Sequence, residues 1–411
     1  MKRRAVYAIF IWHGFFLALT LAMINFGTVL PALVDELTPS RTVFGLLYSI
    51  LLAGPYLFNV IFGHFLSTFR HRRPFLILGI YIRAAAFLGM ALFVWFFGRS
   101  SPGVVVASLF VWLVLFALSG GLAGLVYADI VGKLVPSGER GTLYAVKQFI
   151  SGGASVAGGF IVAATLGSAS MGFPRGYAVL LFIGFVGLMV ASGAFWFIEE
   201  PPSQVRGKRE PLGTLFKSIP GLLRSNPEFR RFVIVENLSG FGLMVLPFYM
   251  LFAKESFDLG GNYVGRYLVV QTAGILLSNL AWGALSRKWS SRAVVAACIL
   301  IGAVTPVLAL FTVRFGPAGF YPVFFLTGFM YSGRRVGFEP YLLDIVPDDE
   351  RPLFLGIRGT MDILVALLPP LGGFFVDMTG FLPLFLTVSV VLSFAFFLLG
   401  TSRRGKQTPG R

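Results

Sequence analysis

Charged residues are scarce in this sequence. Asp, Glu, Lys and Arg make up 13% of the 411 residues, whereas hydrophobic residues make up 56%. Soluble domains carry about 25% charged residues and about 45–50% apolar ones. So few charges cannot cover a water-facing surface of this size, which excludes a soluble globular protein. With 45 Phe residues and a mean hydropathy of +0.81, the composition predicts an integral membrane protein.

Cysteine and histidine are also rare. The single cysteine, Cys298, lies in an apolar run, which excludes a disulfide framework and a cysteine metal cluster. The three histidines, His13, His64 and His71, are scattered over the sequence, so no metal site is expected.

Familiar nucleotide-binding and catalytic motifs are missing. The sequence has no G-x-x-x-x-G-K-[ST] loop to hold ATP phosphates, and neither G-x-S-x-G nor H-E-x-x-H occurs. We therefore expect no enzyme activity and no cofactor. A polytopic membrane enzyme that relies on Asp362 or Glu339 alone is the weakest alternative.

Long apolar runs dominate what is present. A helix that spans a bilayer needs roughly 20 mostly apolar residues. Twelve such runs predict an all-α membrane protein with twelve transmembrane helices. The runs cover about residues 6–33, 43–66, 74–97, 103–132, 142–167, 176–198, 231–253, 263–285, 293–313, 319–345, 353–376 and 382–400.

Positive charge is distributed unevenly between the loops. Acidic residues number 18 against 34 Lys and Arg, for a net charge of +16. Most Lys and Arg lie in the amino terminus, the even-numbered loops and the carboxyl tail, and such loops stay in the cytoplasm. Both termini are therefore expected on the cytoplasmic side of the inner (plasma) membrane. Nucleic acid is not needed to explain the basic excess, which would instead attract anionic lipid headgroups.

One pattern occurs twice in the sequence. "YADIVGKLVPSGERGTLYAVK" (127–147) follows the fourth run, and "YLLDIVPDDERPLFLGIRG" (341–359) follows the tenth. Aligned on Pro136 and Pro347, the two copies are separated by half of a twelve-helix array. A weaker echo links "GHFLSTFRHRRP" after the second run with "GALSRKWSSRAV" after the eighth. The chain is therefore predicted to consist of two pseudo-symmetric six-helix halves.

The domain boundaries follow from this repeat. Residues 1–198 form the expected amino-terminal bundle, 199–230 a cytoplasmic linker, and 231–411 the carboxyl-terminal bundle with a short tail. Apolar residues recur at helical spacing in the linker, which predicts a short amphipathic helix on the inner leaflet. These residues are Leu212, Leu215, Phe216, Ile219, Leu222 and Leu223.

Two sets of loop motifs resemble those of the major facilitator superfamily over the whole chain. Gly63, Arg72 and Arg73 match parts of the signature between helices 2 and 3, although Ser67 replaces its acidic residue. The segment from Asp344 to Arg351 looks like the sugar-porter E-x-x-P-x-x-x-R pattern. The sequence is identified as a divergent, bacterial-type member of this superfamily of secondary transporters.

The resemblance implies a mechanism and a set of partners. The two halves would rock about a site near the bilayer midplane and expose it alternately to each side. The protein would then move a small solute, with or without coupling to protons, and we expect it to act as a monomer. A lipid or amphipathic-drug flippase or exporter on the same fold is the alternative, and the substrate itself cannot be read from these motifs.

Charges at the cytoplasmic loops are candidates for a gate that closes this side. Asp129 and Asp344 lie where helices 4 and 10 reach the cytoplasm, near basic residues of neighbouring loops. Such pairs could bias the equilibrium between two conformations; as solvated loop charges they would only set topology. The candidate gate residues are Asp129, Arg140, Asp344, Arg351, Arg72, Arg73 and Arg292.

Charges within the predicted spans are candidates for the transport site, because such charges are costly and usually mark pathways. Arg334 and Arg335 lie near the midplane, and Arg358 and Asp362 share one helix face. The candidate substrate-binding residues are Arg334, Arg335, Glu339, Asp362, Gln148, Asn25, Gln271 and Asn279. The polar ones could equally bond neighbouring helices, at about 0.6 kcal/mol each, and the Arg358–Asp362 pair could be purely structural.

Glu339 and Asp362 are also the candidates for proton coupling. Burial disfavours the ionised form of a carboxylate, whereas a neighbouring arginine favours it. The opposition of these two effects could bring protonation within the physiological range. A permanently ionised salt bridge to Arg335 or Arg358 is the alternative.

Overall fold

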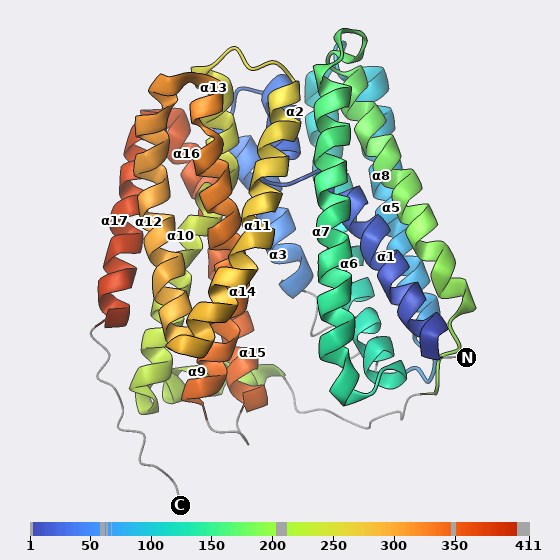
Figure 1. Ribbon diagram of the computed structural model, residues 1–411, viewed down its shortest axis with the longest axis vertical. Coiled ribbons are helices and arrows are strands. Elements are labelled where there is room, and N and C mark those ends of the chain that lie inside the picture. Colours follow the sequence, from blue (N-terminus) through green and yellow to red (C-terminus); the bar gives the residue numbers. More distant parts are fainter. Residues whose placement is uncertain are drawn as a thin grey trace, which may run out of the picture.

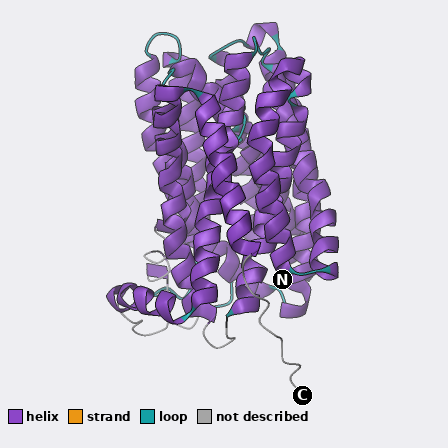
Figure 2. Cartoon of the chain, turned by 90° about the vertical axis from the view of Figure 1, so that its left-hand side faces the viewer, coloured by secondary structure: helices purple, strands orange, loops and turns teal. Residues whose placement is uncertain are grey.

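The structure is a computed structural model that describes residues 3–57, 62, 65–66, 68–202, 212–346 and 351–400. Within these ranges, the side chains of 55–57, 137–138, 141, 212–218, 351–353, 356 and 360 lie outside the description. The described part is helical and contains no strand (Figure 2). This agrees with the all-α fold that the apolar runs predict.

The helices form two bundles joined by a short linker helix (Figure 1). The amino-terminal bundle contains α1 (Arg3–Met23), α2 (Val29–Leu37), α3 (Arg41–Leu57), α5 (Arg73–Phe97), α6 (Pro102–Leu134), α7 (Ser137–Gly167) and α8 (Arg175–Gly193), with short 3-10 turns η1 (Ala169–Met171) and η2 (Ala194–Phe197). The linker contains α9 (Leu212–Ser225). The carboxyl-terminal bundle contains α10 (Pro227–Ser256), α11 (Asn262–Lys288), α12 (Ser291–Thr312), η3 (Val313–Phe315), α13 (Gly316–Gly319), α14 (Tyr321–Ile345), α15 (Arg351–Met361), η4 (Asp362–Leu367), α16 (Leu368–Thr379) and α17 (Phe381–Gly400).

Most of these helices are long and apolar enough to cross a membrane. In the described residues, ten spans meet both conditions. Helix α3 is shorter, with an apolar part at Arg41–Gly54. Helix α14 has 25 residues, but its charged side chains lower its hydropathy. With these two, the helices correspond to the twelve runs predicted from the sequence.

Each bundle is held together by apolar packing between its own helices. In the amino-terminal bundle, α5 packs against α6 and α8, and α1 packs against α7 and α8. In the carboxyl-terminal bundle, α14 packs against α11 and α12, and α17 packs against α10 and α12. The bundles meet along two seams, α7 against α11 and α3 against α16. Figure 1 shows the α7–α11 seam near its centre.

The two ends of the molecule are called the proximal end and the distal end. The proximal end is where α1 begins, and it also holds the linker helix α9 at the foot of the carboxyl-terminal bundle (Figure 1). Ile219 of α9 is buried, and Leu222 and Leu223 pack against the core, as an amphipathic helix requires. The distal end is the opposite one, where α2 meets α3.

Two predicted helices are interrupted in the structure. The run 6–33 forms α1 and α2 with a turn between them, not one helix. The side-chain oxygen of Asn25 accepts hydrogen bonds from the Gly27 amide (2.9 Å) and the Thr28 hydroxyl (3.1 Å), which satisfies groups at the start of α2. The run 353–376 divides into α15, η4 and α16, with Pro369 and Pro370 in the first turn of α16, where proline is tolerated.

Polar contacts between the bundles gather at the distal end. Lys254 of α10 lies 3.0 Å from Asp35 and 2.6 Å from Glu36, both of α2. Asp377 of α16 accepts hydrogen bonds from the backbone amides of Arg41 (2.8 Å) and Thr42 (2.9 Å) at the start of α3. Among the described residues, the ion pairs that join the two bundles all lie at this end.

Candidate functional site

A buried ion pair lies at the centre of the carboxyl-terminal bundle. Glu236 of α10 is 1% exposed, so its carboxylate has almost no access to solvent. The Arg358 side chain of α15 donates to it through Nη2 (2.7 Å) and Nε (3.0 Å). This two-point contact supplies the charge neutralisation without which a buried carboxylate would be very costly.

Two further charged residues adjoin this pair. Arg334 of α14 donates to the Glu236 carbonyl oxygen (3.3 Å) and to the Ser239 hydroxyl, and its guanidinium lies 4.8 Å from the centre of the Phe338 ring. Asp362 lies 3.8 Å from Arg358, and its buried Oδ1 has no hydrogen-bond partner among the described residues. We call Glu236, Arg334, Arg358 and Asp362 the central cluster.

The amino-terminal bundle contributes two buried cations at a similar depth. Arg83 of α5 lies 4.4 Å from the centre of the Phe116 ring and donates to the Phe116 carbonyl (3.4 Å). Lys147 of α7 donates to the Tyr127 hydroxyl (2.7 Å) and lies 4.3 Å from the centre of that ring. The aromatic rings give both cations favourable contacts that need no acid.

The depth of these residues follows from helix geometry. Arg83 and Lys147 each lie ten residues after the first residue of their helix, and Arg335 lies ten residues before the last residue of α14. At 1.5 Å per residue, this places all three about 15 Å from the proximal ends of their helices. That distance is about half of a bilayer core, which is roughly 30 Å thick.

The residues expected to bind substrate do not form one group in the structure. Arg334 and Asp362 belong to the central cluster, whereas Arg335, Glu339 and Gln148 are exposed side chains outside it. Because Arg334 points into its own bundle, the two adjacent arginines face different surroundings. Their roles in substrate binding stay predictions.

The other expected polar residues are engaged within the fold. The side chain of Gln271 is buried and donates to the Thr327 hydroxyl (3.1 Å), and Asn279 accepts from the Ser332 hydroxyl (2.7 Å). Both bonds join α11 to α14. Asn25 is occupied in the turn before α2. All three side chains therefore make packing or capping contacts, and their role in substrate binding stays a prediction.

The expected gate residues lie at the proximal end and bond within one bundle. Asp129 lies 2.8 Å from Arg72 and 2.7 Å from Lys133, while Glu200 accepts from Lys133 (2.5 Å) and from the Arg73 amide (2.7 Å). All five residues belong to the amino-terminal bundle or its exit into the linker. This network stabilises α5 against α6 and does not join the two halves in this conformation.

The remaining expected gate residues, Arg140, Arg292, Asp344 and Arg351, do not belong to this network. Arg140 donates to the Val135 and Gly132 carbonyl oxygens at the end of α6, and Arg292 donates to the Leu399 carbonyl. Asp344 is exposed at the proximal end of α14. The side chain of Arg351 lies outside the described part of the chain.

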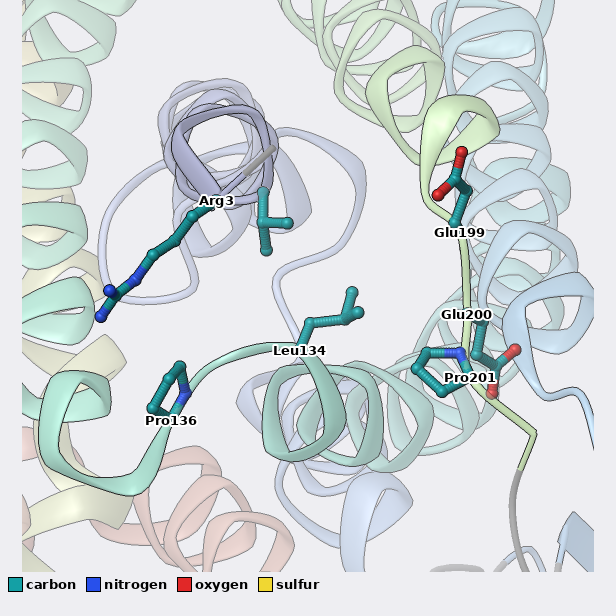
Figure 3. Close-up of a pocket in the computed structure, with 7 residues that line it drawn as sticks. Arg3, Leu134, Pro136, Glu199, Glu200 and Pro201 are labelled. Atoms are coloured by element: carbon teal, nitrogen blue, oxygen red, sulfur yellow. The ribbon is translucent and has the colours of Figure 1, made fainter. Parts of the chain in front are cut away.

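A surface cavity of about 520 Å³ lies at the proximal end of the amino-terminal bundle. Arg3, Leu134 and Glu199 are among the residues that line it, and Figure 3 shows Arg3 and Glu199 on opposite sides. No member of the central cluster lines this cavity. It is therefore separate from the buried charges of the central cluster.

The candidate residues named from the sequence did not include Glu236, Lys147 or Arg83. A carboxylate in the apolar middle of α10 could have indicated Glu236 as a partner for the arginines. No sequence pattern indicated that Arg83 and Lys147 lie at the same depth, because they belong to different helices. In the described residues, no group of three or more His, Cys, Asp and Glu side chains is placed to hold a metal ion.

The fold defines a polytopic helical membrane protein with two bundles. The family model described as Major Facilitator Superfamily matches residues 12–265 and 232–411, which together cover nearly all of the sequence. The chain therefore belongs to the major facilitator superfamily, as the loop motifs indicated.

Solved structures of transporters share the fold at low sequence identity. A variant of the nucleoside transporter NupG has a TM-score of 0.78 at 14% identity, with 96% of this chain and 99% of the other covered. A D-xylose–proton symporter has a TM-score of 0.72 at 13% identity, with 97% of each chain covered. A POT family transporter in complex with 5-aminolevulinic acid has a TM-score of 0.71 at 9% identity, with 97% and 95% covered. No curated protein sequence matches the chain.

Proposed function

We propose that this protein is a proton-coupled secondary transporter that moves a small polar solute by rocker-switch alternating access. The observation that carries the proposal is the central cluster, where Asp362 adjoins a buried Glu236–Arg358 pair. Charges at this depth are costly unless they serve a pathway. The protein would act as a monomer in the plasma membrane, with the proximal end in the cytoplasm according to the distribution of Lys and Arg.

Asp362 is the better of the two candidates for the coupling carboxylate. Its buried Oδ1 has no hydrogen-bond partner among the described residues, and it lies farther from Arg358 (3.8 Å) than Glu236 does (2.7 Å). Because burial disfavours an ionised carboxylate, a proton on Asp362 would lower the cost of burying its weakly paired charge. Glu339 is exposed and would change its surroundings less between conformations.

Coupling would follow from the helix that carries Asp362. The 3-10 segment η4 contacts α3 of the other bundle, so its position depends on how the two bundles meet. A rocking motion would change the contact between η4 and α3, and thereby the surroundings of Asp362 and its affinity for a proton. Solute binding that favours one arrangement would then favour one protonation state.

The similar structures support this kind of activity. Their titles name a nucleoside transporter and a D-xylose–proton symporter, which handle small polar solutes and, in one case, protons. At 13–15% identity they support the fold alone. The identity of the solute and of the coupling ion is therefore tested by experiment.

The test is uptake into proteoliposomes with an imposed pH gradient. The labelled probes are a nucleoside mixture, D-xylose and 5-aminolevulinic acid, and uptake is measured with and without a protonophore. We expect the gradient to drive accumulation in the wild type. Asp362→Asn should abolish accumulation while retaining exchange without a gradient, because its side chain no longer binds and releases a proton.

Asp258→Asn is the matched control, since Asp258 is an exposed carboxylate in the loop before α11. It should transport like the wild type. If wild-type uptake is indifferent to both the gradient and the protonophore, proton coupling is wrong. If no probe enters, the choice of solute class is wrong, and lipid-loaded vesicles would then test the flippase alternative.

A further inference from the structure

A second surface cavity of the amino-terminal bundle, of about 570 Å³, lies at the distal end. It is formed where the end of α5 meets the turn between α7 and α8, two helices of the bundle that Figure 1 labels with α5. Arg99 and Arg175 line it, and none of the described residues that line it is acidic. The proximal cavity of the same bundle differs, since Glu199 and Glu200 line it. The distal cavity therefore presents positive charge without a matching carboxylate.

The two arginines are held close together by a backbone contact. The Arg99 side chain donates to the Phe173 carbonyl oxygen through Nε (3.1 Å) and Nη2 (2.9 Å). Phe173 lies only two residues before Arg175. Gly98 permits this approach, because a Cβ there would lie 2.6 Å from the Pro174 Cβ. These two bonds leave three of the five guanidinium N–H groups of Arg99 for another acceptor.

Arg175 has its whole guanidinium available. Its side chain is exposed and forms no hydrogen bond or ion pair with the residues that the structure describes. Ser100 and Ser170 also line the cavity and add hydroxyl groups, which donate or accept. Guanidinium groups match the geometry of a phosphate and bind it by charge-assisted hydrogen bonds. The cavity therefore has the donors of a phosphate site.

The cavity lies at the depth of lipid headgroups. The spanning segment of α5 ends at Phe97, and that of α8 begins at Arg175, so both arginines lie at the boundary of the apolar region. Trp95 and Phe96, which also line the cavity, are 47% and 66% exposed. Exposed tryptophan is enriched where a membrane protein meets the headgroups. The open side of this cavity is therefore in contact with the bilayer.

Apolar side chains continue from the cavity toward the middle of the bilayer. Leu92 of α5 lies one turn before Phe96, and Phe182 of α8 lies two turns after Arg175 on the same face of the helix; Leu92 and Phe182 are both exposed. At 1.5 Å per residue, they lie about 7.5 Å and about 10.5 Å from the distal ends of their helices. Helices α5 and α8 pack against each other. A ligand with a charged head and an apolar chain matches this arrangement.

We propose that the distal cavity binds an anionic phospholipid of the adjoining leaflet, with the headgroup phosphate between Arg99 and Arg175. The phosphate accepts hydrogen bonds from the Arg175 guanidinium and from the remaining N–H groups of Arg99, and an acyl chain lies against the exposed apolar side chains. A zwitterionic headgroup fits less well, because its ammonium group meets two cations and no carboxylate. The bound lipid joins the end of α5 to the start of α8 and stabilises the bundle, whatever solute the protein transports.

Binding is tested first, on the purified full-length protein in detergent. The lipid probes are phosphatidylglycerol and phosphatidylcholine with identical acyl chains, and the soluble probes are inorganic phosphate and glycerol 1-phosphate. Native mass spectrometry measures the bound lipid, and thermal unfolding measures its effect. We expect phosphatidylglycerol to stay bound and to raise the melting temperature more than phosphatidylcholine does. The soluble phosphates at the same concentration should have no effect, because they lack the acyl chains.

Substitutions of Arg175 locate the site. Arg175→Gln should weaken the binding of phosphatidylglycerol by about tenfold, since it removes a charge-assisted contact. Arg175→Lys should retain part of the binding, because it keeps the charge and loses the fork. Without phosphatidylglycerol, Arg175→Gln should melt like the wild type, because the side chain bonds to no described residue. Arg266→Gln is the matched control, since Arg266 is an exposed cation near the distal end of α11 and lies over the Tyr263 ring (5.2 Å).

A second pair of variants tests charge without removing an arginine. Gly172 lines the cavity, nothing lies within 4 Å of a Cβ there, and its backbone (φ −58°, ψ 163°) suits any residue. Gly172→Glu places a negative charge beside the phosphate and should abolish the preference for phosphatidylglycerol. Gly172→Gln has the same size without the charge and should retain the preference.

Four outcomes would each overturn the lipid site. The first is equal binding of the two lipids, and the second is a preference for phosphatidylglycerol that survives Arg175→Gln. The third is an equal loss in both Gly172 variants, which would show that shape and not charge selects the occupant. The fourth is an equal effect of the soluble phosphates, which would identify the occupant as a free anion.

Discussion

At the scale of single residues, Glu236 organises the charges of the carboxyl-terminal bundle. Its side chain binds Arg358, and its backbone carbonyl accepts from Arg334, so one residue holds two guanidinium groups through different atoms. The ring of Phe232 lies 6.0 Å from the Arg358 guanidinium and excludes water on that side. Removal of either partner therefore leaves a buried charge without compensation.

A double-mutant cycle on Glu236 and Arg358 tests this dependence. Glu236→Gln or Arg358→Gln alone should destabilise the protein by about 3 kcal/mol, the usual cost of breaking a buried pair. The double variant should be destabilised by less than the sum, because neither charge is left alone. Thermal or denaturant unfolding in detergent measures all three. Additive effects would show that the two side chains are not coupled.

At the scale of elements, the seam between α7 and α11 depends on close backbone approach. A Cβ on Gly265 of α11 would lie 2.1 Å from the Ala163 amide nitrogen and 2.5 Å from the Gly159 carbonyl oxygen of α7. Backbone atoms cannot move aside as a flexible side chain does. The helices can pack this tightly only with glycine at position 265, as is common between membrane helices.

Gly265→Ala should therefore push α7 and α11 apart at the distal end. We expect a lower melting temperature, with a loss of at least about 1–3 kcal/mol as for other overpacked sites. Gly153→Ala in α7 is the matched control, because nothing lies within 4 Å of a Cβ there. It should leave the melting temperature unchanged or slightly higher, since alanine favours a helix over glycine by about 1 kcal/mol. An equal loss in both variants would contradict the seam.

At the scale of the whole molecule, the polar contacts between the bundles favour one conformation. Lys254 joins Asp35 and Glu36 across the distal end, and Arg41 lies 3.4 Å from Glu255. The proximal network around Asp129 stays within one bundle. Closure at the distal end and separation at the proximal end are therefore expected for the resting protein, with the solute path open toward the cytoplasm.

Lys254→Gln should weaken the distal closure and shift the population toward the opposite conformation. The expected shift is about fivefold, for a contribution of about 1 kcal/mol. It is read from the reactivity of Tyr144→Cys, since Tyr144 is 44% exposed and its ring lies 6.0 Å from Lys147. A membrane-impermeant thiol reagent applied from the cytoplasmic side should label this cysteine more slowly after the substitution.

Arg314→Gln is the control for this experiment. Arg314 follows α12 at the same end and lies 4.7 Å from the Phe311 ring, without a contact to the other bundle. When Arg314→Gln is combined with Tyr144→Cys, the cysteine should be labelled as fast as in Tyr144→Cys alone. Labelling of Tyr144→Cys from the outer side alone would instead overturn the orientation of the whole chain. The buried Cys298 does not compete for the reagent.

The sequence by itself determined the class of protein and its division into two halves. Apolar runs of spanning length, scarce charge and a repeated proline loop require a membrane bundle of two halves, because each property depends only on local composition and spacing. Contacts between neighbouring loops, such as that of Asp129 with the basic residues before α5, could also be predicted from the sequence. Interruptions such as the Asn25 turn were not, since a short turn leaves the hydropathy of a long run unchanged.

Only the tertiary structure decided which charges meet. Arg334 and Arg335 are adjacent in sequence, yet one turns into its own bundle onto Glu236 and the other remains exposed. Glu236 and Arg358 are 122 residues apart in the sequence, yet their side chains form a buried ion pair. A helix places each residue at a known height, but its rotation and its neighbours are set by packing against other helices. The central cluster therefore exists only once the helices of the carboxyl-terminal bundle have packed together.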